Sequence, residues 1–195
     1  DLGALHAPMY NRERVELSLG SLGGGNHFIE LNQDETGKLY LIIHSGSRSL
    51  GQDVAKWHQK KAVELWLEQK NHTEKGEYVD PEFAYLTGKH MEHYLNDVSI
   101  AQKYAHLNRK AMISEIVKYM GWHIEREFDT IHNYADTEAK ILRKGAISAK
   151  AGEEVLIPIN TRDGSILATC KENADSHQSA PHGAGRLCSR TKSKT

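Results

Sequence analysis

The segment "HFIELNQDETGKLYLIIH", residues 27–44, sets the fold at the start of the chain. Its two ends, "HFIEL" and "LYLIIH", are short runs of β-forming residues, and "NQDETGK" between them has the composition of a turn. A strand, a turn and a second strand in direct succession predict a β-hairpin that ends at His44.

Helical periodicity follows the hairpin, and β signals return after it. Apolar residues at helical spacing predict a helix over about 51–70 and a second helical stretch over about 82–123, in one or two pieces. From residue 125 onward the runs "FDTIH", "AKILRKGA", "EEVLIPI" and "SILATC" predict short strands. The order β, α, α, β predicts an α+β or mixed α/β protein in which two β portions meet across a helical middle.

Length and composition narrow the class of protein. The 195 residues favour one domain, and 25 Lys and Arg against 26 Asp and Glu give a net charge of −1, so any polyanion site must be local. No apolar run approaches the roughly 18 residues of a membrane span, and the N-terminus lacks a signal-peptide pattern. Cys170 and Cys188 are too few for a disulfide scaffold. We therefore expect a soluble, cytoplasmic protein.

The start and end of the sequence indicate a longer protein. The chain begins at Asp1 without a methionine and ends on "RTKSKT" without an obvious terminal element. We expect it to be a fragment, or the ordered part of a longer chain.

Four of the twelve histidines stand in sequence contexts suited to chemistry, and His27 is the first. The glycine triplet 23–25 precedes Asn26 and His27. Consecutive glycines can adopt positive φ and present backbone N–H groups to a phosphate, and the following histidine can bind a metal or transfer a proton. For the triplet alone, turn statistics favour a loose turn followed by a strand histidine.

Two further histidines are predicted at strand ends. His44 ends "LYLIIH" and is followed by small hydroxyl residues and Arg48, a context in which α/β sheets hold ligands and anions. His132 ends "FDTIH" and is followed by Asn133. With His27 these make three strand-end imidazoles, which are common ligands of Mn²⁺, Fe and Zn²⁺. A strand-end histidine capped by serines is the alternative for His44.

His182 stands in the open segment "SAPHGAGR". Small residues on both sides leave room for a bulky ligand at the ring, and Arg186 offers several donors to a phosphate. A histidine that forms a covalent bond to phosphorus needs such access. A glycine-rich turn with a surface histidine is the alternative, and a helix is predicted to begin after this segment.

The other histidines named here and the three tryptophans are assigned structural rather than chemical roles. Exposed helix faces or helix packing account for His58, His72, His90, His93, His106 and His123. The tryptophans are assigned to the core.

Taken together, these segments resemble the RtcB family of RNA-splicing ligases. The matching text is "GGGNHFIE", "IIHSGSRSLG", "IHN", "RKGA" and "SAPHGAGRLCSR", in the family's order over about residues 15–194. The resemblance implies an RtcB-like fold of β segments packed with long central helices, with residues 1–195 as a single catalytic domain.

The resemblance also implies a set of site residues and cofactors. Ligands to a pair of Mn²⁺ ions would be His27, His44 and His132. Contacts to GTP would come from Asn26 at the α-phosphate, Glu30 at the guanine edge, Asn133, and Pro158, Ile159, Asn160, Thr161 and Ser165 of "PINTRDGS". The guanylylated nucleophile would be His182, with Gly183, Ala184 and Gly185 beside the ribose.

The sequence departs from the family pattern in four respects. An upstream DIGCG-type motif, whose Asp and Cys complete the metal pair in the family, is absent from residues 1–195, and a C-terminal lysine that contacts guanine would lie beyond Thr195. The segment "PINTRDGS" and Ser49 differ from the commonest family form, which indicates a divergent paralogue.

Three functions are consistent with this pattern. The first is a GTP- and Mn²⁺-dependent RNA ligase that joins a 3′-phosphate or 2′,3′-cyclic phosphate end to a 5′-hydroxyl end in tRNA splicing or RNA repair. The second is a metal-dependent phosphohydrolase, and the third is a non-catalytic paralogue that binds a nucleotide or RNA. A local basic groove for RNA is predicted from Arg48, Arg143, Lys144, Arg186 and Arg190. The sequence identifies no helper protein.

Overall fold

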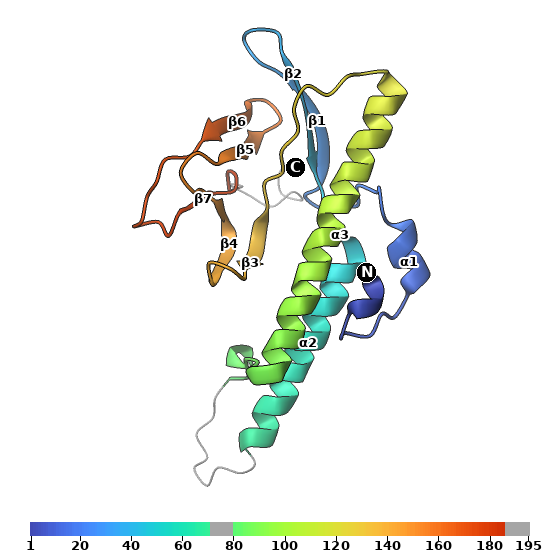
Figure 1. The fold of residues 1–195 in the computed structure, drawn as a ribbon, viewed down its shortest axis with the longest axis vertical. Helices are drawn as coiled ribbons and strands as arrows, with labels where there is room; N and C mark the ends of the chain where they lie inside the picture. The colour runs from blue at the N-terminus through green and yellow to red at the C-terminus, as the bar shows by residue number, and fades with distance from the viewer. Residues whose placement is uncertain (71–79, 186–195) are drawn as a thin grey trace, which may run out of the picture. The chain divides into compact units, whose positions relative to one another are not determined.

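The computed structural model describes residues 1–70 and 80–185, which form helices and antiparallel sheets (Figure 1). The mixed helix and sheet composition agrees with the predicted α+β class. Contacts divide the chain into a first unit, residues 1–123, and a second unit, residues 124–195. The single catalytic domain over residues 1–195 stays a prediction.

The first unit combines a hairpin with two long helices. Its elements in chain order are η1 (Leu2–Ala4), α1 (Arg12–Leu17), β1 (Phe28–Gln33), β2 (Leu39–His44), α2 (Arg48–Lys70), η2 (Pro81–Phe83) and α3 (Gly88–Met120). Helices α2 and α3 lie side by side and run in opposite directions (Figure 1).

The predicted hairpin is confirmed. Strands β1 and β2 pair antiparallel, with Phe28 opposite His44 at the open end and Gln33 opposite Leu39 at the turn. Asp34 organises the turn, because its carboxylate accepts hydrogen bonds from the Thr36 side chain and from the Thr36 and Lys38 N–H groups. These bonds, foremost that of the Thr36 hydroxyl, lower the pKa of Asp34 to about 2.

The predicted helices are present with altered ends. Helix α2 begins at Arg48, three residues before the predicted start. The stretch 82–123 contains the short η2 and one continuous α3, which ends at Met120 because Gly121 adopts a left-handed conformation with φ of 65°. The short helix α1 was missed, since six residues are too few to show a helical period; Asn11 caps it by accepting from the Arg14 N–H.

Asp97 of α3 fastens the N-terminal segment to the helix pair. Its fully buried carboxylate accepts hydrogen bonds from the His6 N–H at 2.9 Å and the Ala7 N–H at 2.8 Å, and His58 Nε2 lies 2.8 Å away. Ala7 is thereby held in the apolar cluster that includes Tyr104. The buried His58 confirms its assignment to helix packing. Of the other assigned histidines, His72 lies outside the described residues.

The second unit consists of two antiparallel sheets. Its strands are β3 (His132–Asp136), β4 (Ile141–Ser148), β5 (Glu154–Asn160), β6 (Gly164–Thr169) and β7 (Ser179–Pro181). One sheet has the order β3-β4-β7, and β5 and β6 form a hairpin. The predicted runs "AKILRKGA", "EEVLIPI" and "SILATC" correspond to β4, β5 and β6.

The predicted strand "FDTIH" is wrong, because β3 begins at His132 instead of ending there. The residues before it do not join a backbone ladder; instead the Thr130 hydroxyl accepts a hydrogen bond from the Leu156 N–H. His132 therefore stands at the entry of a strand, although "FDTIH" had the composition of a strand that ends on it.

The structure also bears on the expectations about membrane spans and cysteines. No helix among the described residues has the length and apolar character needed to cross a membrane. Cys170 is a free thiol, and Cys188 and the helix predicted after "SAPHGAGR" lie outside the described residues.

Replacing Asp97 tests the fastening of the N-terminal segment. We expect Asp97→Ala to lower the free energy of unfolding by about 3 kcal/mol at pH 7, because it leaves the buried Ala7 N–H and the buried His58 ring without their acceptor. Urea unfolding measures this loss. Glu92→Ala, an exposed acidic residue of the same helix, should change stability by no more than about 0.5 kcal/mol.

The same variant makes a pH prediction. Burial raises the pKa of Asp97, but the bonds from His6, His58 and Ala7 outweigh burial and hold the pKa below its ordinary value of 3.8. The stabilisation is therefore present above about pH 4 and is lost as the pH falls through the lowered pKa. The wild type should lose more stability than Asp97→Ala between pH 5 and strongly acidic solution. Parallel pH profiles of the two proteins would contradict this assignment.

Candidate functional site

The glycine triplet is a specific turn built around Arg48. Gly23 and Gly25 have φ of 86° and 77°, and the Arg48 guanidinium occupies the space in which a Cβ on Gly23 would lie, with Nη1 1.5 Å from that position. Arg48 donates from Nε to Ser21 Oγ at 3.1 Å and from Nη1 to the Leu22 carbonyl at 3.3 Å. The interpretation as a loose turn is therefore wrong, because only glycine leaves room for the side chain that holds this loop.

His27 is held with a defined ring orientation. Its Nδ1 lies 2.8 Å from the Leu22 carbonyl oxygen, which can only accept, and 3.4 Å from Arg48 Nη1, which can only donate. The shorter contact favours the tautomer with the proton on Nδ1 and the lone pair on Nε2. Fixing one ring nitrogen by a backbone carbonyl is how metal-binding histidines are usually oriented. Half-buried His27 therefore fits the predicted role of a metal ligand through Nε2.

His44 lies beside His27 at the open end of the hairpin. Their ring centroids are 5.9 Å apart, and the Phe28 ring lies 5.2 Å from that of His44. The register places Glu30 opposite Ile42, so Glu30 shares the hairpin face of Phe28 and His44. Asn26 is exposed and directly precedes His27. The structure thus brings these four predicted site residues to one end of the first unit.

Asn108 of α3 ties together the loops that flank both histidines. Its fully buried side chain accepts from the Gly20 N–H at 2.7 Å and the Ser21 N–H at 3.0 Å. It donates to Ser45 Oγ at 3.0 Å and to the Gly46 carbonyl at 3.2 Å. Sequence reasoning missed Asn108, although its place in the apolar stripe of α3, between Tyr104 and Met112, was a signal for a buried polar group.

The turn at Gly23 can be tested against its neighbour. We expect Gly23→Ala to lower the free energy of unfolding by about 2 kcal/mol, because the methyl group displaces the Arg48 guanidinium from its hydrogen bonds and the backbone keeps a positive φ. Gly24 has open space around it and no positive φ, so Gly24→Ala should cost less than about 0.5 kcal/mol. Equal losses in urea unfolding would show that Arg48 does not impose the glycine.

In the second unit, His132 and His182 are stacked. Their ring centroids are 4.6 Å apart and the planes differ by 25°. The sheet order explains this contact, since His132 pairs with Ile147 on one side of β4 and Pro181, directly before His182, pairs with Ala146 on the other side. The predicted metal ligand and the predicted nucleophile of this unit are thus adjacent.

Asn133 and Gly145 shape the backbone beneath these rings. A register shift in β3 leaves Asn133 outside the ladder with φ of 55°, and its Oδ1 accepts a hydrogen bond from the Gly145 N–H at 2.6 Å. Gly145 has φ of 68°, and a Cβ there would lie 3.7 Å from His182 Cε1. Gly145 therefore leaves one edge of the His182 ring uncovered. Asn133, predicted to line a nucleotide site, holds the backbone next to that ring.

The two predicted GTP-binding segments lie against each other. The Ala184 N–H donates to the Pro158 carbonyl at 3.1 Å, and a Cβ on Gly183 would come within 3.0 Å of the same oxygen. Gly183 is thus required by close approach of the backbone. The exposed Gly185 follows these residues.

The rest of "PINTRDGS" forms the end of the β5–β6 hairpin. Asn160 Oδ1 accepts from the Arg162 and Asp163 N–H groups and so closes the turn, with Ile159 and the exposed Thr161 on either side. Ser165 pairs with Pro158, and within the described residues its buried hydroxyl has no hydrogen-bond partner. The role of these residues as GTP contacts, which the family resemblance implies, stays a prediction.

The predicted basic groove needs correction. Arg143 is buried and donates to Asp136, Tyr134 and Ser179, so it stabilises the sheet and cannot contact RNA. The Arg48 guanidinium is engaged with the glycine turn. Lys144 is exposed, and Arg186 and Arg190 lie outside the described residues. A basic side chain is recognised in the sequence, but its partners depend on tertiary contacts.

The metal set is divided between the two units. His27 and His44 belong to the first, and His132 belongs to the second. Within residues 1–70 and 80–185, no three His, Cys, Asp or Glu side chains converge as a metal-binding group. The Mn²⁺ pair therefore stays a prediction.

The space beside His182 can be tested with two glycines of similar backbone conformation. Gly145 and Gly152 both have positive φ, but a Cβ on Gly152 would have no neighbour within 4 Å. We expect Gly145→Ala and Gly152→Ala each to lower the free energy of unfolding by about 1 kcal/mol. Only Gly145→Ala should slow modification of His182 by diethyl pyrocarbonate, followed by mass spectrometry. Equal modification rates would contradict the role of Gly145.

Comparisons with known proteins give a consistent result. A family model described as tRNA-splicing ligase RtcB matches residues 4–195. The RNA-splicing ligase RtcB of Escherichia coli K12 is 34% identical, over 90% of this chain and 47% of its own length. The tRNA-splicing ligase RtcB of Aeropyrum pernix is 29% identical, over 94% of this chain and 47% of its own length. The chain spans about half the length of these relatives.

Proposed function

Because this chain belongs to the RtcB family, we propose that it forms part of an RNA ligase that joins RNA 3′-phosphate or 2′,3′-cyclic phosphate ends to 5′-hydroxyl ends. The proposed role is tRNA splicing or RNA repair, with GTP and Mn²⁺ as cofactors. The observation that carries the proposal is the constellation around His182, in which one ring edge is left open by Gly145 and a second histidine is stacked on the ring.

His182 is the proposed nucleophile. One ring nitrogen forms a bond to the α-phosphorus of GTP, the bond from that phosphorus to the bridging oxygen breaks, and pyrophosphate leaves with the electron pair. An RNA 3′-phosphate oxygen then takes the GMP group from His182. The RNA 5′-hydroxyl finally attacks the activated 3′-phosphate, which releases GMP and forms the phosphodiester bond.

The neighbours of His182 have separate proposed roles. Stacking by His132 fixes the plane of the His182 ring, and the backbone bond between Ala184 and Pro158 keeps the 183–185 segment against the β5–β6 hairpin. Small residues at 183–185 allow the nucleotide to approach the backbone beside the ring. The approach of the phosphate is thus governed by the sheet rather than by a flexible loop.

The histidines of the first unit have a proposed metal role. His27 would bind through Nε2, with His44 beside it and His132 as a further ligand. When bound, Mn²⁺ supplies Lewis-acid stabilisation to the charged phosphoryl groups. Asn26 and Glu30 are proposed to contact the α-phosphate and the guanine edge.

Covalent labelling tests the proposed nucleophile. The full-length protein is incubated with α-³²P-labelled GTP and Mn²⁺, and the chain should acquire label that is stable to base and released by acid, as expected for a phosphoramidate. His182→Ala should abolish the label. His177→Ala, an exposed histidine of the same unit outside this constellation, should retain it.

The outcomes separate the three functions. No label on the wild-type protein would sink the guanylylated-histidine mechanism. A phosphohydrolase would release phosphate from RNA ends in both the wild type and His182→Ala. A non-catalytic paralogue would bind GTP or RNA without label and without turnover.

A further inference from the structure

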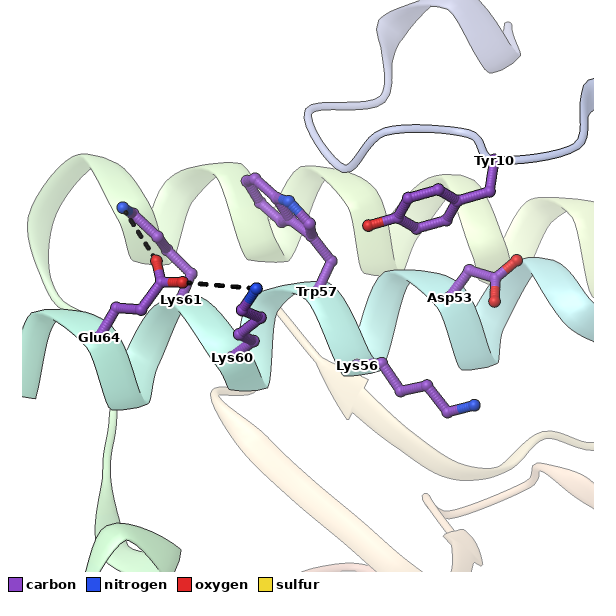
Figure 2. A pocket seen from close by; sticks show the side chains of 7 residues that line it. All are labelled: Tyr10, Asp53, Lys56, Trp57, Lys60, Lys61 and Glu64. Carbon is purple, nitrogen blue, oxygen red and sulfur yellow. Dashed lines mark hydrogen bonds and ion pairs between the residues drawn. The ribbon is translucent and has the colours of Figure 1, made fainter.

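A hollow of about 300 Å³ lies on α2 in the first unit, and neither His27 nor His44 is among its lining residues. Figure 2 shows the Tyr10 ring lying over the helix beside Trp57, with Lys56 and Lys60 extending from neighbouring turns. All lining residues belong to the first unit, so the hollow is complete within it.

Positive charge is in excess at this hollow. Its lining contains three lysines, Lys56, Lys60 and Lys61, and two carboxylates, Asp53 and Glu64. Lys60 and Lys61 share the single carboxylate of Glu64, at 3.8 Å and 3.5 Å. Lys56 has no ion pair within the described residues and is exposed. An anion could therefore be met by Lys56 and by whichever lysine leaves Glu64.

Two aromatic side chains stand next to these cations. Tyr10 is 73% exposed, so most of its side chain is accessible to a binding partner. Trp57 is half-buried, since it packs against the apolar cluster of the first unit while also lining the hollow. Trp57 therefore gives a rigid floor, and Tyr10 gives a ring face that is open to a planar group.

We propose that this hollow is a contact site for single-stranded RNA, with a base against Tyr10 and Trp57 and the adjoining phosphates at Lys56 and Lys60. The inference rests on the proposed function for its choice of ligand. Aromatic faces that accept bases next to cations that track the backbone are the usual means of binding single strands without sequence preference. An acidic peptide would use the lysines but would leave the aromatic rings without a planar partner.

The hollow also supplies exposed cations for contacts to RNA phosphates. Arg143 of the predicted RNA groove is buried in the sheet, and the Arg48 guanidinium is hydrogen-bonded within the glycine turn. Among the described residues of that groove only Lys144 keeps an exposed and unengaged cation, so further phosphate contacts need other cations. Lys56 and Lys60 of α2 meet this need because they are exposed and line the same hollow as two aromatic side chains.

Fluorescence anisotropy with a fluorescein-labelled 12-nucleotide oligoadenylate tests the site in the full-length protein. We expect Lys56→Ala with Lys60→Ala to weaken binding about tenfold and to reduce the slope of log K against log salt by about 1.4, at about 0.7 per phosphate contact. Tyr10→Ala should weaken binding about fivefold or more through lost stacking. Lys103→Ala with Lys110→Ala removes two exposed lysines of α3 and should change binding less than twofold.

Two further measurements make the result unambiguous. Urea unfolding should show that all variants keep wild-type stability, and labelling of His182 by GTP should be unchanged in each. Wild-type RNA affinity in both the double lysine variant and Tyr10→Ala would overturn the proposal. Binding to polyglutamate is measured in parallel. If the variants lose polyglutamate binding but keep RNA binding, the proposal is also overturned, because the occupant is then an acidic protein. Absent GTP label with Lys56-dependent RNA binding would refute only the proposed ligase mechanism.

Discussion

The candidate site of the first unit depends on one buried amide, the side chain of Asn108. Its Oδ1 accepts hydrogen bonds from the Gly20 and Ser21 N–H groups, and its Nδ2 donates to Ser45 Oγ and the Gly46 carbonyl. These segments flank the loops that carry His27 and His44. Because a buried amide must satisfy its donors and acceptors, α3 dictates where both histidines stand.

A comparable arrangement recurs elsewhere in each unit. Asp97 holds the N-terminal segment, and Arg143 joins β3, β4 and the segment before β7 in the second unit. All three side chains are buried and polar, and each connects pieces of chain that are distant in sequence. In a small unit with few large apolar residues in its core, such groups fix loop positions that apolar packing alone leaves free.

Glycine has two different uses at the site. Gly23 gives its side-chain space to the Arg48 guanidinium, and Gly145 leaves an edge of His182 uncovered. The first use determines the shape of a loop, whereas the second determines chemical access to a ring. Both require positive φ, so neither position accepts another residue without strain. The motifs "GGGNH" and "RKGA" therefore carry geometric information beyond their flexibility.

The sequence by itself determined the local elements and the family. Runs of β-forming residues and turn chemistry predicted the hairpin ending at His44, and helical spacing predicted α2 and α3. The motifs around His27, His44, His132 and His182 indicated the RtcB family. These features depend on neighbouring residues, which periodicity records. Only the tertiary structure decided that His132 opens its strand, that Arg143 is buried, and that His182 stacks on His132. Such contacts join residues far apart in the chain, and no local pattern encodes which of several polar side chains will meet a buried partner.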